Sequence, residues 1–134
     1  MEVQVFDDKT FDKDVGRKFL NDIMIKSGVE EYHEDSEQHF LNLMVTLSVA
    51  NIVIVKDDEG NGGFCIYDEV SYDPHMIGEG LCMLVTVSNS TACTKAIMKH
   101  ILDICRERDL DFLHMSHRIA PYTYRCQYHL LRKH

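Results

Sequence analysis

The stretch Gly80–Arg108, GLCMLVTVSNSTACTKAIMKHILDICRER, decides the fold that this sequence predicts. Its first part, Leu81–Val87, is apolar and rich in β-branched residues, and its length favours a buried strand over a helix. The polar residues Ser88–Thr91 suit a helix N-terminus. Apolar residues then recur at helical spacing, at Ile97, Ile101, Ile104 and Cys105. The sequence therefore predicts a strand that runs into a long helix, and the free backbone N–H groups at that turn could bind an anion.

Length and composition bound the class of protein. A chain of 134 residues is long enough for one domain with its own core, which we expect over residues 1–134. No apolar run reaches the roughly 20 residues that cross a bilayer, and the first residues, MEVQVFDDK, are not typical of a signal peptide. The five cysteines form no CxxC pair and stand mostly in apolar runs. This pattern indicates reduced thiols in a cytoplasmic (intracellular) protein that does not bind membranes.

The formal charge of −8 is unevenly distributed. The residues before Lys95 include 18 acidic and 6 basic side chains, for a net −12, whereas those from Lys95 onward include 4 acidic and 8 basic ones, for a net +4. Nucleic-acid binding needs a broad basic face, which the overall acidic charge disfavours. The basic C-terminal third could instead receive an anionic ligand or the acidic face of another copy.

Helix signals surround the central segments. A cap at Thr10 and a stop at Gly28 bound a first helix, and a second begins at Asp35 or Ser36. The acidic run Glu30–Glu37 indicates a solvated connection. A last helix is expected from Pro121 through Tyr124, Tyr128 and Leu131.

Strand signals complete a mixed sheet. Strands are expected over Glu2–Phe6, Asn51–Lys56, Phe64–Val70, Leu81–Val87 and Phe112–Met115. The resulting order is β-α-α-β-β-β-α-β-α. The residues from 51 to 87 should form an antiparallel meander, and the two strands joined by the long helix should be parallel. The sequence therefore predicts an α/β class with helices on the faces of a mixed sheet.

This order, with a strand that turns into a helix after a meander, resembles the Gcn5-related N-acetyltransferase superfamily over nearly the whole chain. The resemblance implies that the strands Leu81–Val87 and Phe112–Met115 splay apart and that acyl-CoA lies in the gap. It also implies that the pyrophosphate binds backbone amides at the start of the helix. Acetyl-CoA is therefore the expected cofactor, without a metal. The resemblance places its pantetheine arm along Leu84, Val85, Thr86 and Val87.

The family's pyrophosphate motif, Arg/Gln-x-x-Gly-x-Gly/Ala, has a degenerate counterpart here. Its fixed positions fall on Asn89, Ala92 and Thr94. Alanine is small enough to replace the first glycine, whereas the branched side chain of Thr94 crowds the surface that phosphate must approach. The amides that the resemblance assigns to the phosphates are those of Ala92, Cys93, Thr94 and Lys95, with the hydroxyls of Ser90 and Thr91 beside them. The alternative is that this elbow is only a helix cap.

The family's chemistry implies a base that deprotonates the acceptor amine and a tyrosine that protonates the leaving thiolate. Tyr128 falls near the position of that tyrosine, with Tyr124 one turn earlier. Glu79 and Glu69 are the carboxylates nearest the position of the base. The structural alternatives are an aromatic residue at the edge of the core and solvated surface carboxylates.

Two further patterns have structural explanations. His114 and His117 are spaced like a short metal motif, but residues i and i+3 of a strand face opposite sides, and no third ligand is evident. Cys93, at a helix start, could be an activated nucleophile, or it could be a small buried thiol.

The resemblance implies two more strands after the last helix, and this chain ends without them. The strand Phe112–Met115 would then have an open edge, which a second copy or a protein partner could cover. Two functions are expected on this scaffold. One is an acyl-CoA-dependent N-acyltransferase-like domain with weakened or lost activity, and the other is a non-catalytic binding or assembly protein. A faint likeness to acetyltransferase-like internal virion proteins of podophages makes a phage virion component one form of the second.

Overall fold

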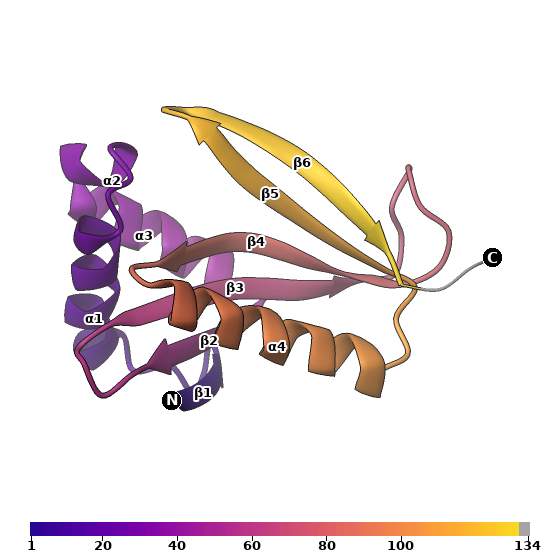
Figure 1. The fold of residues 1–134 in the computed structure, drawn as a ribbon, viewed down its shortest axis with the longest axis horizontal. Helices are drawn as coiled ribbons and strands as arrows, with labels where there is room; N and C mark the ends of the chain where they lie inside the picture. The colour runs from indigo at the N-terminus through magenta and orange to yellow at the C-terminus, as the bar shows by residue number, and fades with distance from the viewer. Residues whose placement is uncertain (132–134) are drawn as a thin grey trace.

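Six strands stand side by side in chain order in residues 1–131, the part of the chain that this computed structural model describes (Figure 1). All neighbouring strands are antiparallel except for β4 and β5, which are parallel. The strands are β1 (Glu2–Asp7), β2 (Asn51–Lys56), β3 (Gly62–Val70), β4 (Gly80–Ser88), β5 (Phe112–Ala120) and β6 (Thr123–Leu130). The helices are α1 (Lys13–Lys26), α2 (Glu31–Glu34), α3 (Ser36–Leu47) and α4 (Thr91–Glu107). The α/β class, the meander and the parallel crossover are confirmed.

Helices cover both faces of the sheet, which divides the core in two. Ile52 and Ile54 of β2 pack toward α1 and α3, on what we call the α1–α3 face. Val53 and Val55 pack toward α4, on the α4 face. Because both faces of β2 are buried, its sequence is an unbroken apolar run and does not alternate between apolar and polar residues.

Side-chain caps fix the helix starts. Asp35 caps α3 by accepting from the Gln38 N–H, as predicted, and Ser90 caps α4 by accepting from the Cys93 N–H at 3.1 Å. The first helix differs, because its cap is Asp12. Thr10 instead binds Asp7 in the preceding turn. None of the helices in the described part of the chain combines the length and the apolar character that crossing a bilayer requires.

The acidic segment between α1 and α3 is exposed at Glu30, Glu34, Asp35 and Glu37, as the sequence suggested, but it is more than a connection. It contains the short helix α2, and Glu31 is only 5% exposed. Glu31 is buried because Arg118 of β5 forms an ion pair with it, a contact between residues far apart in the chain.

The predicted last helix is wrong, since Pro121 begins a hairpin turn and Thr123–Leu130 is strand β6. Tyr124, Cys126, Tyr128 and Leu130 occupy alternate positions with Thr123, Arg125, Gln127 and His129 between them. This period of two is a strand pattern, but the four-residue spacing from Tyr124 to Tyr128 fits a helix as well. Pro121 has the same backbone angle in both settings, so it does not discriminate between them.

The open edge predicted for the fifth strand is wrong for the same reason. β5 runs on to Ala120, well beyond the predicted end at Met115, and pairs with β6 along its length. Tyr122 closes the hairpin in the left-handed region, with φ 57°. The outer edge of this side of the sheet is therefore β6. Figure 1 shows the hairpin leaning away from β4.

Candidate functional site

β4 and β5 are paired only at one end. Their register covers Gly80 with Phe112, Leu81 with Leu113 and Cys82 with His114, and it stops there. From Met83 onward the two strands diverge, as Figure 1 shows. The splay that the family resemblance implied is therefore present. It leaves the backbone groups of β4 that point toward β5 without a strand partner from Met83 to Ser88.

A β-bulge at Leu84 accompanies the divergence. Ile66 of β3 pairs with Val85 and the next residue, Tyr67, pairs with Met83, so Leu84 has no partner on β3. The extra residue changes which side chains face which core. Met83 packs on the α4 face and Val85 on the α1–α3 face, although they are two residues apart and would share a face in a regular strand.

A cleft occupies the space between the diverging strands and opens on both faces of the sheet. It measures about 320 Å³ on the α1–α3 face and about 530 Å³ on the α4 face, volumes typical of ligand sites. The walls shared by both openings are Met83, Thr86, Ser116 and Arg118. The other wall residues are Val29, Tyr32, Leu84, Val85 and Tyr124 on the first face, and Ser88, Thr94, Met98, Met115, His117, Gln127 and His129 on the second.

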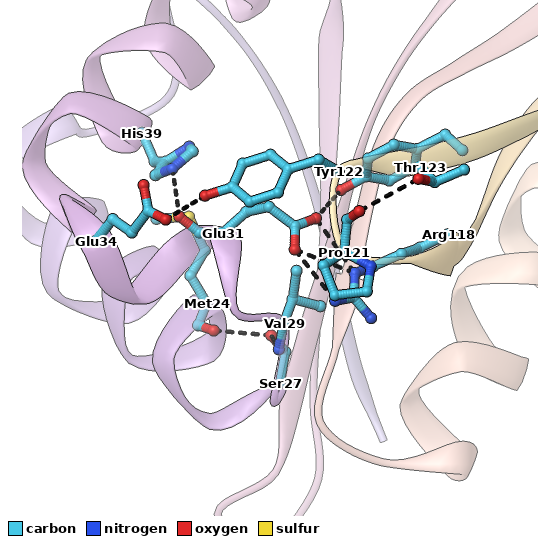
Figure 2. A network of polar contacts seen from close by, with 11 residues as sticks. Met24, Ser27, Val29, Glu31, Glu34, His39, Arg118, Pro121, Tyr122 and Thr123 are labelled. Atoms are coloured by element: carbon cyan, nitrogen blue, oxygen red, sulfur yellow. Dashed lines mark hydrogen bonds and ion pairs between the residues drawn. The ribbon is translucent and has the colours of Figure 1, made fainter.

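The tip of the β5–β6 hairpin is tied to α2 (Figure 2). Arg118 donates from Nε to both carboxylate oxygens of Glu31, at 3.3 and 3.2 Å, and from its terminal nitrogen at 3.1 Å. Tyr124 donates its hydroxyl to Glu31 at 2.7 Å, and Tyr122 donates to Glu34. We call these residues the hairpin latch. The latch holds the far wall of the cleft at the end where β4 and β5 are not paired.

The contacts within the hairpin latch also shift the pKa values of its ionisable side chains. The Arg118 guanidinium and, after it, the Tyr124 hydroxyl lower the pKa of Glu31 to about 2, against the opposing effect of burial. Glu31 in turn raises the pKa of Arg118. Burial and the hydrogen bond to Glu31 raise the pKa of Tyr124. Glu31 is therefore a carboxylate at neutral pH whose two oxygens both have donors, which makes it a poor proton acceptor for a ligand.

The elbow between β4 and α4 uses most of its polar groups internally. Asn89 accepts from the Gly62 N–H through its side chain and donates its own N–H to the Gly62 carbonyl. Ser90 occupies the Cys93 N–H with its side chain and the Thr94 N–H with its carbonyl. Thr94 also folds its hydroxyl back onto that carbonyl at 3.1 Å. Asn89 therefore fastens the turn to β3, and Cys93 and Thr94 have their amides engaged.

The cofactor-binding residues predicted on β4 and α4 have different surroundings. Leu84, Val85 and Thr86 line the cleft. Val87 is buried in the α1–α3 core. At the helix start, Ala92, Thr94 and Lys95 are exposed, whereas Cys93 is fully buried in the α4 core. Its burial favours the small structural thiol over the nucleophile.

The predicted catalytic residues lie away from the cleft walls. Glu79 precedes the paired end of β4, and its backbone exchanges hydrogen bonds with Asp111. Tyr128 lies on β6, opposite His114, and donates its hydroxyl to Asp73 at 3.0 Å. Glu69, the other carboxylate considered, forms an ion pair with Arg108. None of the three is among the residues that line the cleft in the described structure.

The histidine pair does not converge. His117 lines the α4-face opening, whereas His114 contacts Cys82 and stacks on Tyr128. Within residues 1–131, no three His, Cys, Asp or Glu side chains are grouped so that they could hold a metal ion. The wall residues that the sequence did not single out include Met83, Ser116 and Arg118, and Tyr124 was expected on a helix. Local sequence gave no clear signal for the longer β5, because Ser116, His117 and Arg118 are three consecutive polar residues and break the alternation typical of a strand.

Comparisons with known proteins are sparse. No protein-family profile matches the chain, and no curated protein matches it. A similar solved structure is described as "histone acetyltransferase HPA2 and related acetyltransferase" from Corynebacterium glutamicum ATCC 13032. The alignment covers 87% of this chain and 77% of that chain, with 12% sequence identity and a TM-score of 0.46. Similarity at this level does not indicate a function for this chain.

Proposed function

We propose that the cleft between β4 and β5 binds the pantetheine arm of an acyl-CoA thioester, in an N-acyltransferase-like domain whose transfer activity is weak or lost. The observation that carries the proposal is the early end of β4–β5 pairing at Cys82 together with the bulge at Leu84. An extended amide-containing chain can pair with the free edge of β4 as an added strand. When bound, the thioester would supply an activated acyl group.

The residues present fit such an arm along most of its length. Met83 and Leu84 offer apolar contacts, and Thr86 and Ser116 offer hydroxyl groups from opposite walls. The backbone groups of β4 that face β5 have no strand partner from Met83 to Ser88, and a free N–H donor there could stabilise charge on a carbonyl oxygen. At the helix start, the amides of Thr91 and Ala92 are free of the cap bonds that occupy Cys93 and Thr94. The phosphates would therefore meet a smaller anion site than the family motif provides.

We expect weak or absent N-acyl transfer because the polar groups of the described cleft walls include no carboxylate that could deprotonate an acceptor amine. No Asp or Glu is among the wall residues of either opening in the described structure. Glu31 is close by, but Arg118 and Tyr124 occupy its oxygens. Among the described wall residues, the candidate bases for an acceptor amine are His117 and His129, both on the α4 face.

Binding of acetyl-CoA provides the test, with two variants at one position. At a hundred times its dissociation constant, a ligand that binds only the folded state stabilises it by about 2.7 kcal/mol. Deletion of Leu84 should abolish this gain, because the deletion removes the bulge and leaves Met83 and Val85 facing their present cores. Leu84→Ala keeps the residue count and therefore the bulge, so it should retain most of the gain and lose only the contact that the leucine side chain makes with the arm. Absence of a thermal shift at millimolar acetyl-CoA in the unaltered protein would contradict the proposal.

A second candidate is a non-catalytic assembly component, including the virion role that the podophage likeness suggested. It is favoured by the acid-free cleft and by the exposed strand β6, whose outer edge is a potential docking edge for another chain. Light scattering tests it. A clean monomer that also transfers acetyl groups to amines would rule it out, whereas a dimer disrupted by a proline at Arg125 in the middle of β6 would favour it.

A further inference from the structure

A thiol and an imidazole meet where β4 and β5 part. Cys82 and His114 form the last residue pair between the two strands, and Cys82 Sγ lies 3.3 Å from His114 Nδ1. We propose that Cys82 and His114 are a nucleophilic dyad that takes the acyl group of a thioester onto Cys82 Sγ. This inference rests on the proposed function, because the cleft supplies the route by which a thioester reaches the pair.

Cys82 and His114 end the paired segment of β4 and β5, next to the point where the cleft begins, and neither is itself a wall residue. Met83, the residue after Cys82, is a wall of both openings, and so is Ser116, two residues after His114. Because alternate residues of a strand share a face, Ser116 and His114 project from the same side of β5. Cys82 is half-buried, in contrast to the fully buried cysteines of the core.

Aromatic packing holds the imidazole in place. The Tyr128 ring stacks on the His114 ring with centroids 4.4 Å apart and planes at 15°. Tyr128 is in turn anchored by its hydrogen bond to Asp73. His114 Nε2 is buried and has no hydrogen-bond partner among the described residues. No neighbour therefore fixes the proton on Nε2 or Nδ1, and the tautomer that accepts a proton at Nδ1 is accessible.

The thiol needs such a base. Burial, followed by the charges of Asp73 and Asp68, raises the pKa of Cys82, so the resting group is a thiol. The step balances without an oxidant or a reductant. His114 Nδ1 accepts the Cys82 proton while Sγ bonds to the acyl carbon, and the carbon–sulfur bond of the thioester breaks. The proton then passes from His114 to the departing thiolate.

No other thiol in the described structure has this arrangement. Cys65, Cys93 and Cys105 are buried in the core. Cys126 is exposed, but its hydrogen-bond contact is the Ser116 hydroxyl at 3.8 Å, which is not a base. Cys126 therefore serves as an internal reference, because any unassisted acylation should favour the more exposed thiol.

The test uses two probes and peptide mapping by mass spectrometry. S-acetyl-N-acetylcysteamine is a short thioester that needs no phosphate site, and acetyl-CoA is the full ligand. Both should acetylate Cys82 at least about tenfold faster than Cys126 in the unaltered protein. Equal rates at the two thiols, or labelling of Cys126 alone, would overturn the dyad. This comparison uses the unaltered protein, so it tests the dyad even if a substitution at Cys82 impairs folding.

Variants assign the roles. His114→Gln should slow acetylation of Cys82 by about a hundredfold or more, the usual loss when a general base is removed, and Cys126→Ser should leave it unchanged. Tyr128 is a positioning residue, so Tyr128→Ala should slow the step. Tyr128→Phe should retain most of the rate, because it keeps the stacked ring and loses only the hydrogen bond to Asp73. An unchanged rate in His114→Gln would refute the dyad.

The two probes separate this inference from the proposed function. Stabilisation by acetyl-CoA without acetylation of Cys82 would leave the cleft proposal intact and remove the dyad. Acetylation by the short thioester without any stabilisation by acetyl-CoA would support the dyad and count against CoA as the natural thioester.

Discussion

The closed end of the cleft depends on a close contact between Gly80 and Phe112. A Cβ atom at Gly80 would lie 2.2 Å from Cε2 of Phe112 and within 2.5 Å of two more ring atoms, whereas carbon pairs are most favourable at about 3.5–4.0 Å. Phe112 is fully buried, so its ring cannot rotate into solvent. Gly80→Ala should therefore destabilise the protein by about 1–3 kcal/mol, the usual cost of overpacking.

The sign of the change in the free energy of unfolding caused by Gly80→Ala distinguishes a close contact from open space. In an unhindered strand, Gly→Ala stabilises by about 0.4–1 kcal/mol through the unfolded chain. Phe112→Ala should cost about 3–5 kcal/mol because it leaves a cavity. The double variant should cost little more than Phe112→Ala, since the methyl group then has room. The coupling energy should thus equal the cost of the clash, about 1–3 kcal/mol.

Urea unfolding followed by far-UV circular dichroism measures all four proteins. Gly63→Ala is the matched control. A Cβ atom there would lie 3.0 Å from Ile97 Cδ1 and 3.1 Å from Ser88 Cβ and the Val87 carbonyl oxygen, so its cost should be smaller than that of the 2.2 Å contact at Gly80. Costs that add within about 0.5 kcal/mol would refute the reasoning, because independent sites behave in that way. In that case β4 and β5 would not approach each other as closely as the paired end of the cleft requires.

Three further predictions concern the latch and the elbow. The pKa of Glu31 is lowered from 4.5 to about 2, so its contribution to stability is complete above pH 4.5 and is lost as the pH falls toward 2. Glu31→Gln should lack this part of the acid dependence, which urea midpoints measured between pH 4.5 and pH 2 would show. Ser90→Ala should cost about 1 kcal/mol by removing the cap of α4, measured by urea unfolding, and an unchanged midpoint would contradict the cap. Thr94→Gly should tighten acetyl-CoA binding in calorimetry if Thr94 occupies the second glycine position of the phosphate motif, and no change would show that it does not.

The central part of the fold was predictable because its local signals agree. The β-branched run of β2 and the amphipathic repeat of α4 each fit one secondary structure only, and their predicted bounds match the structure closely. Tyr124 and Tyr128 were misassigned because a four-residue spacing satisfies both a helix and a strand. Only the neighbouring residues Arg125 and Gln127, which are polar at every second position, distinguish the two.

The site was harder to predict because its parts depend on contacts between distant segments. Glu31 looked like one acid in a solvated run, and only the approach of Arg118 explains its burial. Leu84 belongs to a run in which every residue favours a strand, so nothing local marks it as the residue without a partner. The pairing of Cys82 with His114 depends on the register of two parallel strands, which no local pattern specifies.

The bulge at Leu84 has a consequence for how such a protein can change. Without Leu84, Met83 and Val85 would be consecutive residues that face opposite sides of the strand, so each would keep its place in its present core. One in-frame codon could therefore separate a split sheet from a continuous one without any change in the hydrophobic pattern. Proteins that descend from this scaffold could lose or regain the cleft between β4 and β5 by a single insertion or deletion, without any change in the packing of the core.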